Sequence, residues 1–142
     1  MELRIATSDD ATWINERYES VGFVLSDLAR HFVIIAELDG IPAGLGRLVP
    51  ASDTAYELGG MLVFEEYRGR GIARAIIEQL LRHAGDRAVY CIPFAELEPI
   101  YAGVGFVRRE AEEDVPKGIR EKLDWCAREL PERPVILMML ER

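Results

Sequence analysis

Residues 68–73, Arg68-Gly69-Arg70-Gly71-Ile72-Ala73, bring two arginines and two glycines to the point where an apolar segment gives way to a helical pattern. Apolar residues at positions 72, 75, 76, 80 and 84 have the spacing of a buried helical face. The first turn of a helix carries N–H groups without intrahelical acceptors and partial positive charge. Glycines let a ligand approach the backbone, and arginines suit phosphate oxygens. We therefore predict that residues 68–73 bind an anionic, phosphate-bearing ligand.

Three other interpretations of this segment can be compared with the sequence. A P-loop requires a lysine after its last glycine, whereas Ile72 follows Gly71. A dinucleotide fingerprint requires glycine or alanine three residues after Gly71, where Arg74 stands. It also requires a loop that follows the strand directly, whereas residues 64–67 lie between the two here. These two are excluded. A tight basic turn whose arginines are merely solvated is not excluded by the motif alone.

The composition is that of a globular protein, with 49% hydrophobic residues among 142, and we expect one domain spanning residues 1–142. No apolar run approaches the length of a membrane span and the N-terminus lacks a signal-peptide pattern, so we expect a cytoplasmic protein with no membrane partner. The net charge of −8 argues against a nucleic-acid partner. His31, His83, Cys91 and Cys126 lack metal-ligand spacing, so we expect no metal.

Periodicity and turn residues predict an α/β or α+β fold with a mixed sheet. The expected strands are residues 3–6, 32–38, 41–49, 57–63, 88–92, 105–109 and 135–140. Helices are expected after the capping box at 7–10, from the glycine-rich loop to Gly85, over 96–103, and from Pro116 to residue 130. We also expect a hairpin at Asp39-Gly40, a turn at 50–54 and one more helical turn at 26–30.

Two ordered motifs resemble those of the GNAT N-acetyltransferase superfamily. The family's pyrophosphate motif, Arg/Gln-x-x-Gly-x-Gly/Ala after a strand and before a helix, is matched by Arg68–Ala73. Its tyrosine motif, YxxxGF, is matched by Tyr101-Ala102-Gly103-Val104-Gly105-Phe106. The resemblance implies a mostly antiparallel sheet of about six to seven strands, flanked by helices and splayed at the cofactor-binding strand. It also implies transfer of acetyl from acetyl-CoA to a primary amine of a small molecule, by direct attack in a ternary complex.

The resemblance assigns roles to residues around the loop. The backbone of Met61, Leu62 and Val63 would receive the pantetheine arm and polarise the thioester carbonyl, as an oxyanion hole does. Tyr101 would protonate the departing thiolate, since a phenol has a pKa of about 10 and a thiol about 8.5. Glu57 matches the position of a glutamate base in some members. It could equally be a structural partner of Arg47 on the preceding strand.

The acceptor is the least defined part of the resemblance. The tail from residue 115 onward faintly resembles N-acetylglutamate synthase-like members, which would mean an amino-acid acceptor held by Arg17 or Arg47. Two departures from the family stand out: Phe94 replaces an asparagine that contacts the cofactor arm, and residues 110–133 insert a helix. The missing asparagine and the two open roles of Glu57 keep an alternative open, a non-catalytic CoA-binding sensor or interaction module. A homodimer is compatible with the resemblance, because family members often dimerise.

Overall fold

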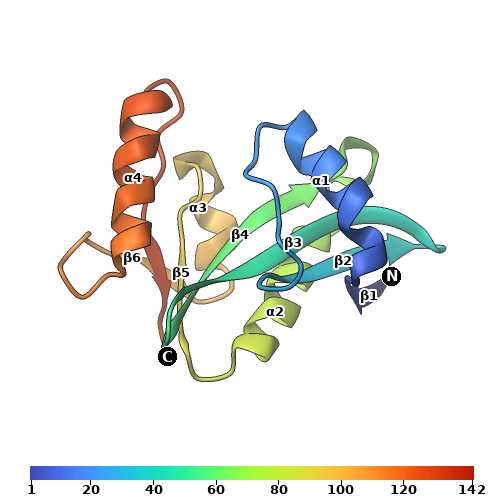
Figure 1. The fold of residues 1–142 in the computed structure, drawn as a ribbon, viewed down its shortest axis with the longest axis horizontal. Coiled ribbons are helices and arrows are strands. Elements are labelled where there is room, and N and C mark those ends of the chain that lie inside the picture. The colour runs from blue at the N-terminus through green and yellow to red at the C-terminus, as the bar shows by residue number, and fades with distance from the viewer.

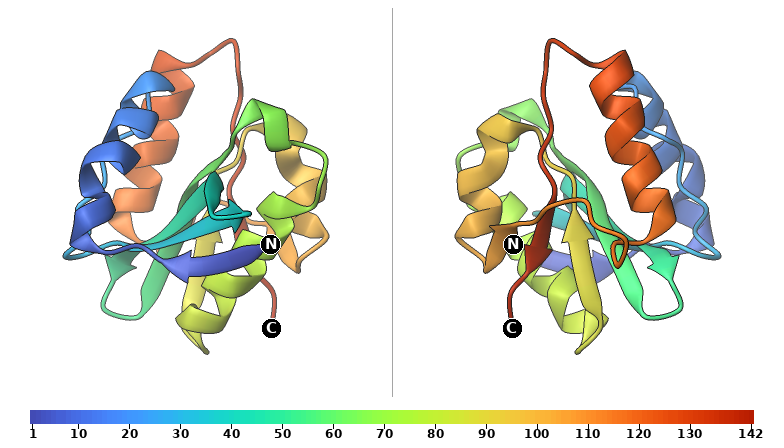
Figure 2. Two further views of the ribbon diagram at one scale, coloured as in Figure 1. Left: turned by 90° about the vertical axis from the view of Figure 1, so that its right-hand side faces the viewer. Right: turned by 90° about the vertical axis from the view of Figure 1, so that its left-hand side faces the viewer.

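A computed structural model describes residues 1–142 as one seven-stranded sheet with helices on both faces (Figures 1 and 2). The strand order is β1-β2-β3-β4-β5-β7-β6, and only β4 and β5 run parallel. This is the mixed, mostly antiparallel sheet predicted from the sequence. The strands are β1 (Glu2–Ile5), β2 (Phe32–Leu38), β3 (Ile41–Ser52), β4 (Ala55–Val63), β5 (Ala88–Cys91), β6 (Phe106–Arg108) and β7 (Met138–Leu140).

The helices divide between the two faces of the sheet. Figure 2 shows α1 (Ala11–Ser20) and α4 (Lys117–Glu129) on one face, and α2 (Ile72–Ala84) and α3 (Glu98–Ala102) on the other. Short 3-10 turns are present at Ser8–Asp10, Glu65–Tyr67 and Ala95–Leu97. No helix combines the length and the apolar character that crossing a bilayer requires.

Each long helix buries one apolar face against the sheet. The largest core cluster packs α2 against the central strands, with Ile72, Ile76 and Leu80 almost without exposure. A second cluster packs Ile14 and Tyr18 of α1 against the other face. In a third, Ile119 near the start of α4 packs with Ala55, Tyr90, Val115 and Leu137. The face of α2 predicted from its periodicity is therefore the buried one.

The hairpin between β2 and β3 confirms one local prediction, and the next turn corrects another. Asp39 and Gly40 form the two-residue connection, both with positive φ. The turn expected at 50–54 is shorter, because β3 continues through Pro50 to Ser52. The pairing of β3 with β2 ends at Leu48. Pro50, which has no N–H to donate, therefore lies beyond that pairing and interrupts no hydrogen bond to β2.

The two remaining helical predictions hold in part. Residues 26–30 are not assigned as a helix, but they form a hydrogen-bonded turn, in which the N–H groups of Arg30 and His31 both donate to the Asp27 carbonyl, at 3.0 and 2.8 Å. Pro116 is the N-cap residue of α4 and not its first helical residue, with φ −51° and ψ 140°. The insertion nevertheless contains the helix predicted for it.

Candidate active site

β4 separates from β5 halfway along its length, and a cavity of about 660 Å³ lies beside the separated half. β5 pairs only with Ala55–Leu58, so the last residues of β4 have no strand on that side. The splayed strand expected from the sequence is therefore present. The predicted site residues that line this cavity are Met61, Leu62, Val63, Arg68, Gly69, Gly71, Ile72, Ala73 and Tyr101.

The loop before α2 leaves a helix N-terminus open toward solvent. Gly71 is the N-cap residue, and the first bond within the helix runs from the Ala75 N–H to the Gly71 carbonyl at 3.1 Å. The three N–H groups between them therefore lack an acceptor within the helix. Gly69 and Gly71 have φ of +79° and +77°, and a Cβ on either would meet no heavy atom within 4 Å. Backbone conformation requires glycine here, and the space around the loop is free for a ligand.

The two arginines of the loop occupy different environments. Arg68 lines the cavity, and its Nε donates to the Val63 carbonyl at 3.2 Å, which ties the loop to the end of β4. Arg70 does not line the cavity, and its guanidinium carbon lies 5.7 Å from the centre of the Tyr67 ring. The structure thus brings Arg68 and not Arg70 to the cavity wall.

Tyr101 reaches the cavity from α3 and is only 6% exposed. Its ring packs edge-to-face on Phe106, with centroids 6.0 Å apart, so the first and last residues of the tyrosine motif contact each other. Gly105 between them has φ +106°, which favours glycine. Burial, and then the nearby Cys91, raise the pKa of Tyr101 well above its ordinary value. Its hydroxyl therefore stays protonated at neutral pH and is able to donate a hydrogen bond.

Arg133 also lines the cavity and was not predicted from the sequence. Its guanidinium carbon lies 3.6 Å from the centre of the Phe94 ring, and its Nη2 pairs with Glu96 Oε1 at 2.6 Å. Phe94, in place of the family's asparagine, lines the same cavity. No local motif marks Arg133, because it comes from the segment after α4 and meets Phe94 only in the folded chain.

Glu57 lies on the opposite side of β4 from the cavity. It pairs with Lys122 of α4, with Nζ 2.5 Å from Oε2, and its side chain is 15% exposed. The pairing with Arg47 considered from the sequence is therefore wrong. In the β3–β4 register Arg47 faces Gly59 and not Glu57, and the Arg47 guanidinium stacks on Tyr18 while Lys122 binds the carboxylate.

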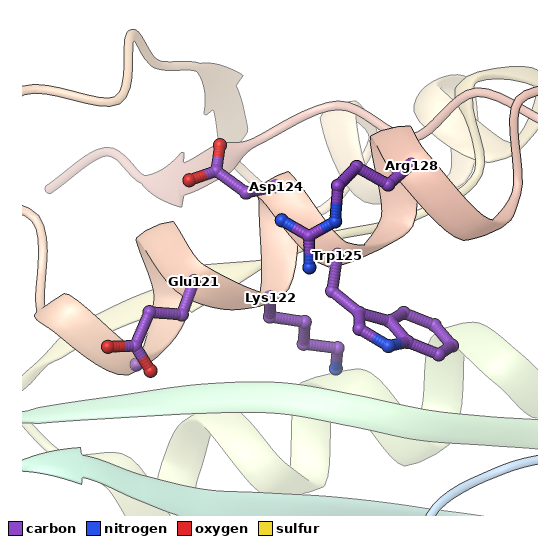
Figure 3. Close-up of a pocket in the computed structure, with 6 residues that line it drawn as sticks. Glu121, Lys122, Asp124, Trp125 and Arg128 are labelled. Carbon is purple, nitrogen blue, oxygen red and sulfur yellow. The ribbon is translucent and has the colours of Figure 1, made fainter.

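A groove of about 510 Å³ runs along α4 beside this ion pair. Its labelled residues in Figure 3 all belong to α4, and Lys122 and Trp125 extend from the helix toward the strands. The groove contains none of the residues predicted for cofactor binding.

The two arginines considered for binding the acceptor stack on aromatic rings that lie on the face of the sheet covered by α1. The guanidinium carbon of Arg17 lies 4.0 Å from the centre of the Phe64 ring, and that of Arg47 lies 4.4 Å from the centre of the Tyr18 ring. Neither lines the cavity. Arg47 is 7% exposed, and its Nη1 is buried without a hydrogen-bond partner. Burial lowers the pKa of Arg47, with nearby Tyr18 and Glu57 opposing that shift.

Comparison with known proteins identifies the family. The profile described as the acetyltransferase (GNAT) family matches residues 3–101, and the chain belongs to this family. It is thus an acyl-CoA-dependent acetyltransferase, as the two motifs indicate. No curated protein sequence matches the chain.

Several solved structures share the fold at low sequence identity. Rv2747 from Mycobacterium tuberculosis, solved in complex with CoA and a second ligand, has 20% identity and a TM-score of 0.77, with 100% of this chain and 99% of that chain covered. Escherichia coli ElaA has 17% identity and a TM-score of 0.68, with 99% of each chain covered. N-acetylglutamate synthase from Neisseria gonorrhoeae, complexed with coenzyme A and N-acetyl-glutamate, has 17% identity and a TM-score of 0.70, and the match covers 99% of this chain and 35% of that chain.

Proposed function

We propose that the protein transfers acetyl from acetyl-CoA to the primary amine of a small molecule, by direct attack in a ternary complex. The observation that carries the proposal is one cavity in which the loop before α2, the separated half of β4 and Tyr101 lie together. An amino-acid acceptor is supported by the similarity of fold to an N-acetylglutamate synthase complexed with N-acetyl-glutamate.

The residues around the cavity suit acetyl-CoA. The open N-terminus of α2 and Arg68 offer donors and positive charge for the pyrophosphate, at one end of a cavity that is otherwise largely apolar. The separated part of β4, residues 61–63, has no strand partner on its β5 side, and its backbone groups there are offered to the pantetheine arm. Bound there, acetyl-CoA supplies a thioester whose carbonyl carbon forms the new C–N bond as the C–S bond breaks.

Two groups on the cavity side would stabilise this exchange. A backbone N–H at Met61 or Leu62 would donate to the carbonyl oxygen as negative charge develops there. The Tyr101 hydroxyl would donate to the departing sulfur as the C–S bond breaks and give it its proton; the raised pKa keeps the hydroxyl protonated beforehand but does not itself favour the transfer.

On the other side of β4, Glu57 is proposed to receive the proton that the amine loses, directly or through water. Lys122 holds this carboxylate in position from α4, because the ion pair fixes Oε2. Direct transfer is also supported by Cys91: burial raises the pKa of its thiol, which therefore stays protonated and is a poor nucleophile for an acyl-enzyme route.

A thiol-release assay with acetyl-CoA tests the proposal. The acceptor panel contains amino acids, polyamines, aminoglycosides and peptides with free N-termini. At least one class should release CoA thiol, with intersecting initial-rate lines and no acetylated enzyme by mass spectrometry. Glu57→Gln should lower kcat with the active acceptor, by about 100-fold for a lost general base. CoA binding without thiol release from any amine would contradict the proposed reaction, and an acetyl-enzyme would contradict direct attack.

A further inference from the structure

Arg47 is a buried cation without an anionic partner. It is 7% exposed, forms no ion pair, and its Nη1 has no hydrogen-bond partner. Removing a guanidinium from water is costly unless a counter-charge and hydrogen bonds compensate for it. The stacking on Tyr18 compensates only in part, because a ring face accepts no directional hydrogen bond from Nη1. The arrangement is therefore incomplete in the protein alone.

The local backbone is arranged to admit this side chain. Gly60 has φ +58°, and a Cβ there would lie 2.7 Å from Arg47 Nε and 2.6 Å from the Tyr18 hydroxyl oxygen. The Tyr18 hydroxyl donates to the Gly60 carbonyl at 2.8 Å. Thus α1, β3 and the irregular part of β4 together hold the guanidinium beside residue 60, one position before the Met61 backbone proposed to face the thioester.

The proposed base lies close to the same point. In the register Arg47 faces Gly59, and a Cβ on Gly59 would be 3.6 Å from Glu57 Oε2. The Glu57 carboxylate and the Arg47 guanidinium therefore flank Gly59 on the face of the sheet that carries α1 and α4.

No group of the protein neutralises the charge of Arg47. Glu57 is already paired with Lys122. Burial, and then the Arg47 charge itself, lower the pKa of the neighbouring His31, so that His31 adds no positive charge at neutral pH. Tyr18 stays uncharged because burial raises its pKa. The set of Arg47, Glu57 and Lys122 carries one uncompensated positive charge.

We propose that the acceptor carries a carboxylate near its amine, and that Arg47 binds this carboxylate while the amine lies beside Glu57. This inference rests on the proposed function. One carboxylate supplies the missing single charge and matches the planar fork of a guanidinium. An acceptor without an anion would bring its ammonium group toward an uncompensated cation, and its binding would be weakened. The substrate class is thus an amino acid or a similar amino carboxylic acid.

The test compares amino acids with their amides in the same thiol-release assay. For the wild-type protein, kcat/KM should be on the order of 100-fold higher for an L-amino acid than for its amide, the effect of a charge-assisted hydrogen-bonded pair. In Arg47→Met this preference should fall to within about threefold. The Tm of this variant should not fall, because an unpaired buried charge is removed. Arg82→Ala, an exposed arginine on α2, is the matched control and should keep the preference.

A second readout needs no turnover. With CoA present, the L-amino acid should raise the Tm of the wild-type protein and not that of Arg47→Met, whereas the amide should raise neither. If Arg47→Met fails to fold, Arg47→Lys keeps the charge, loses the fork and should reduce the preference. Amides acetylated as fast as acids would overturn the carboxylate site while leaving the transferase reaction intact. If no amine releases thiol, the reaction is wrong, and the Tm shift alone decides the carboxylate site.

Discussion

Replacing Gly60 by alanine should destabilise the protein at the point where Arg47, Tyr18 and β4 meet. The φ of +58° would cost an L-residue about 1–2 kcal/mol. The new Cβ would lie 2.6 Å from the Tyr18 hydroxyl oxygen, so the hydrogen bond to the Gly60 carbonyl would break or lengthen, at a further cost of about 1 kcal/mol. The total is about 2–3 kcal/mol, a fall in Tm of about 6–12 °C at about 3–4 °C per kcal/mol for a chain of this size.

Urea and thermal unfolding of Gly60→Ala and Gly59→Ala together measure this effect. Gly59 is the matched control, because it has no positive φ and a Cβ there would meet only Glu57 Oε2, at an ordinary 3.6 Å. Gly59→Ala should change the unfolding free energy by less than about 1 kcal/mol. Equal stability of the two variants and the wild-type protein would refute the described geometry of Gly60, and with it the placement of Arg47.

Three further outcomes are expected. Arg68→Ala should weaken CoA binding on the order of 10-fold in calorimetric titration, and Arg70→Ala by less than about threefold, because only Arg68 lines the cavity; the reverse order would contradict the loop geometry. Tyr101→Phe should lower kcat on the order of 100-fold while leaving Tm nearly unchanged, and an unchanged rate across pH would remove Tyr101 as the acid. Hydrogen bonds from Arg4 hold the pKa of Asp10 well below its ordinary value. The ionised Asp10 carboxylate therefore stabilises the fold fully above about pH 4, the pKa of the unfolded state, and this stabilisation is lost as pH falls through the lower pKa of the folded state. Urea unfolding from about pH 6 to about pH 2 should therefore show a smaller loss for Asp10→Asn than for the wild-type protein.

The sequence was most informative where a function depends on adjacent residues. Residues 68–73 combine a helix start, two positive-φ glycines and a basic side chain within one short segment, so their order along the chain already describes their arrangement in space. The Tyr101–Phe106 spacing is similar, because the two rings contact each other across one turn. The hairpin of the sheet could be predicted too, since the Asp39-Gly40 turn acts locally.

Contacts between distant segments were predicted wrongly or not at all. Glu57 and Arg47 are near neighbours on adjacent strands, yet the β3–β4 register and the approach of α4 pair Glu57 with Lys122, 65 positions away. Arg133 reaches Phe94 only because the segment after α4 returns beside the cavity. Pro50 was assigned to a turn because the sequence does not show that β3 extends past the pairing of β2.

By itself, the sequence determined the family, the strand–loop–helix unit that suits a phosphate-bearing cofactor, and the tyrosine of the cavity, since each depends on local backbone preferences and short spacing. The tertiary structure alone decided which charges meet. It directed Arg68 and not Arg70 to the cavity, paired Glu57 with Lys122, and left Arg47 buried beside Gly60 without a counter-charge. The physical reason is that burial and ion pairing depend on strand register and helix docking, which arise only when distant parts of the chain pack together.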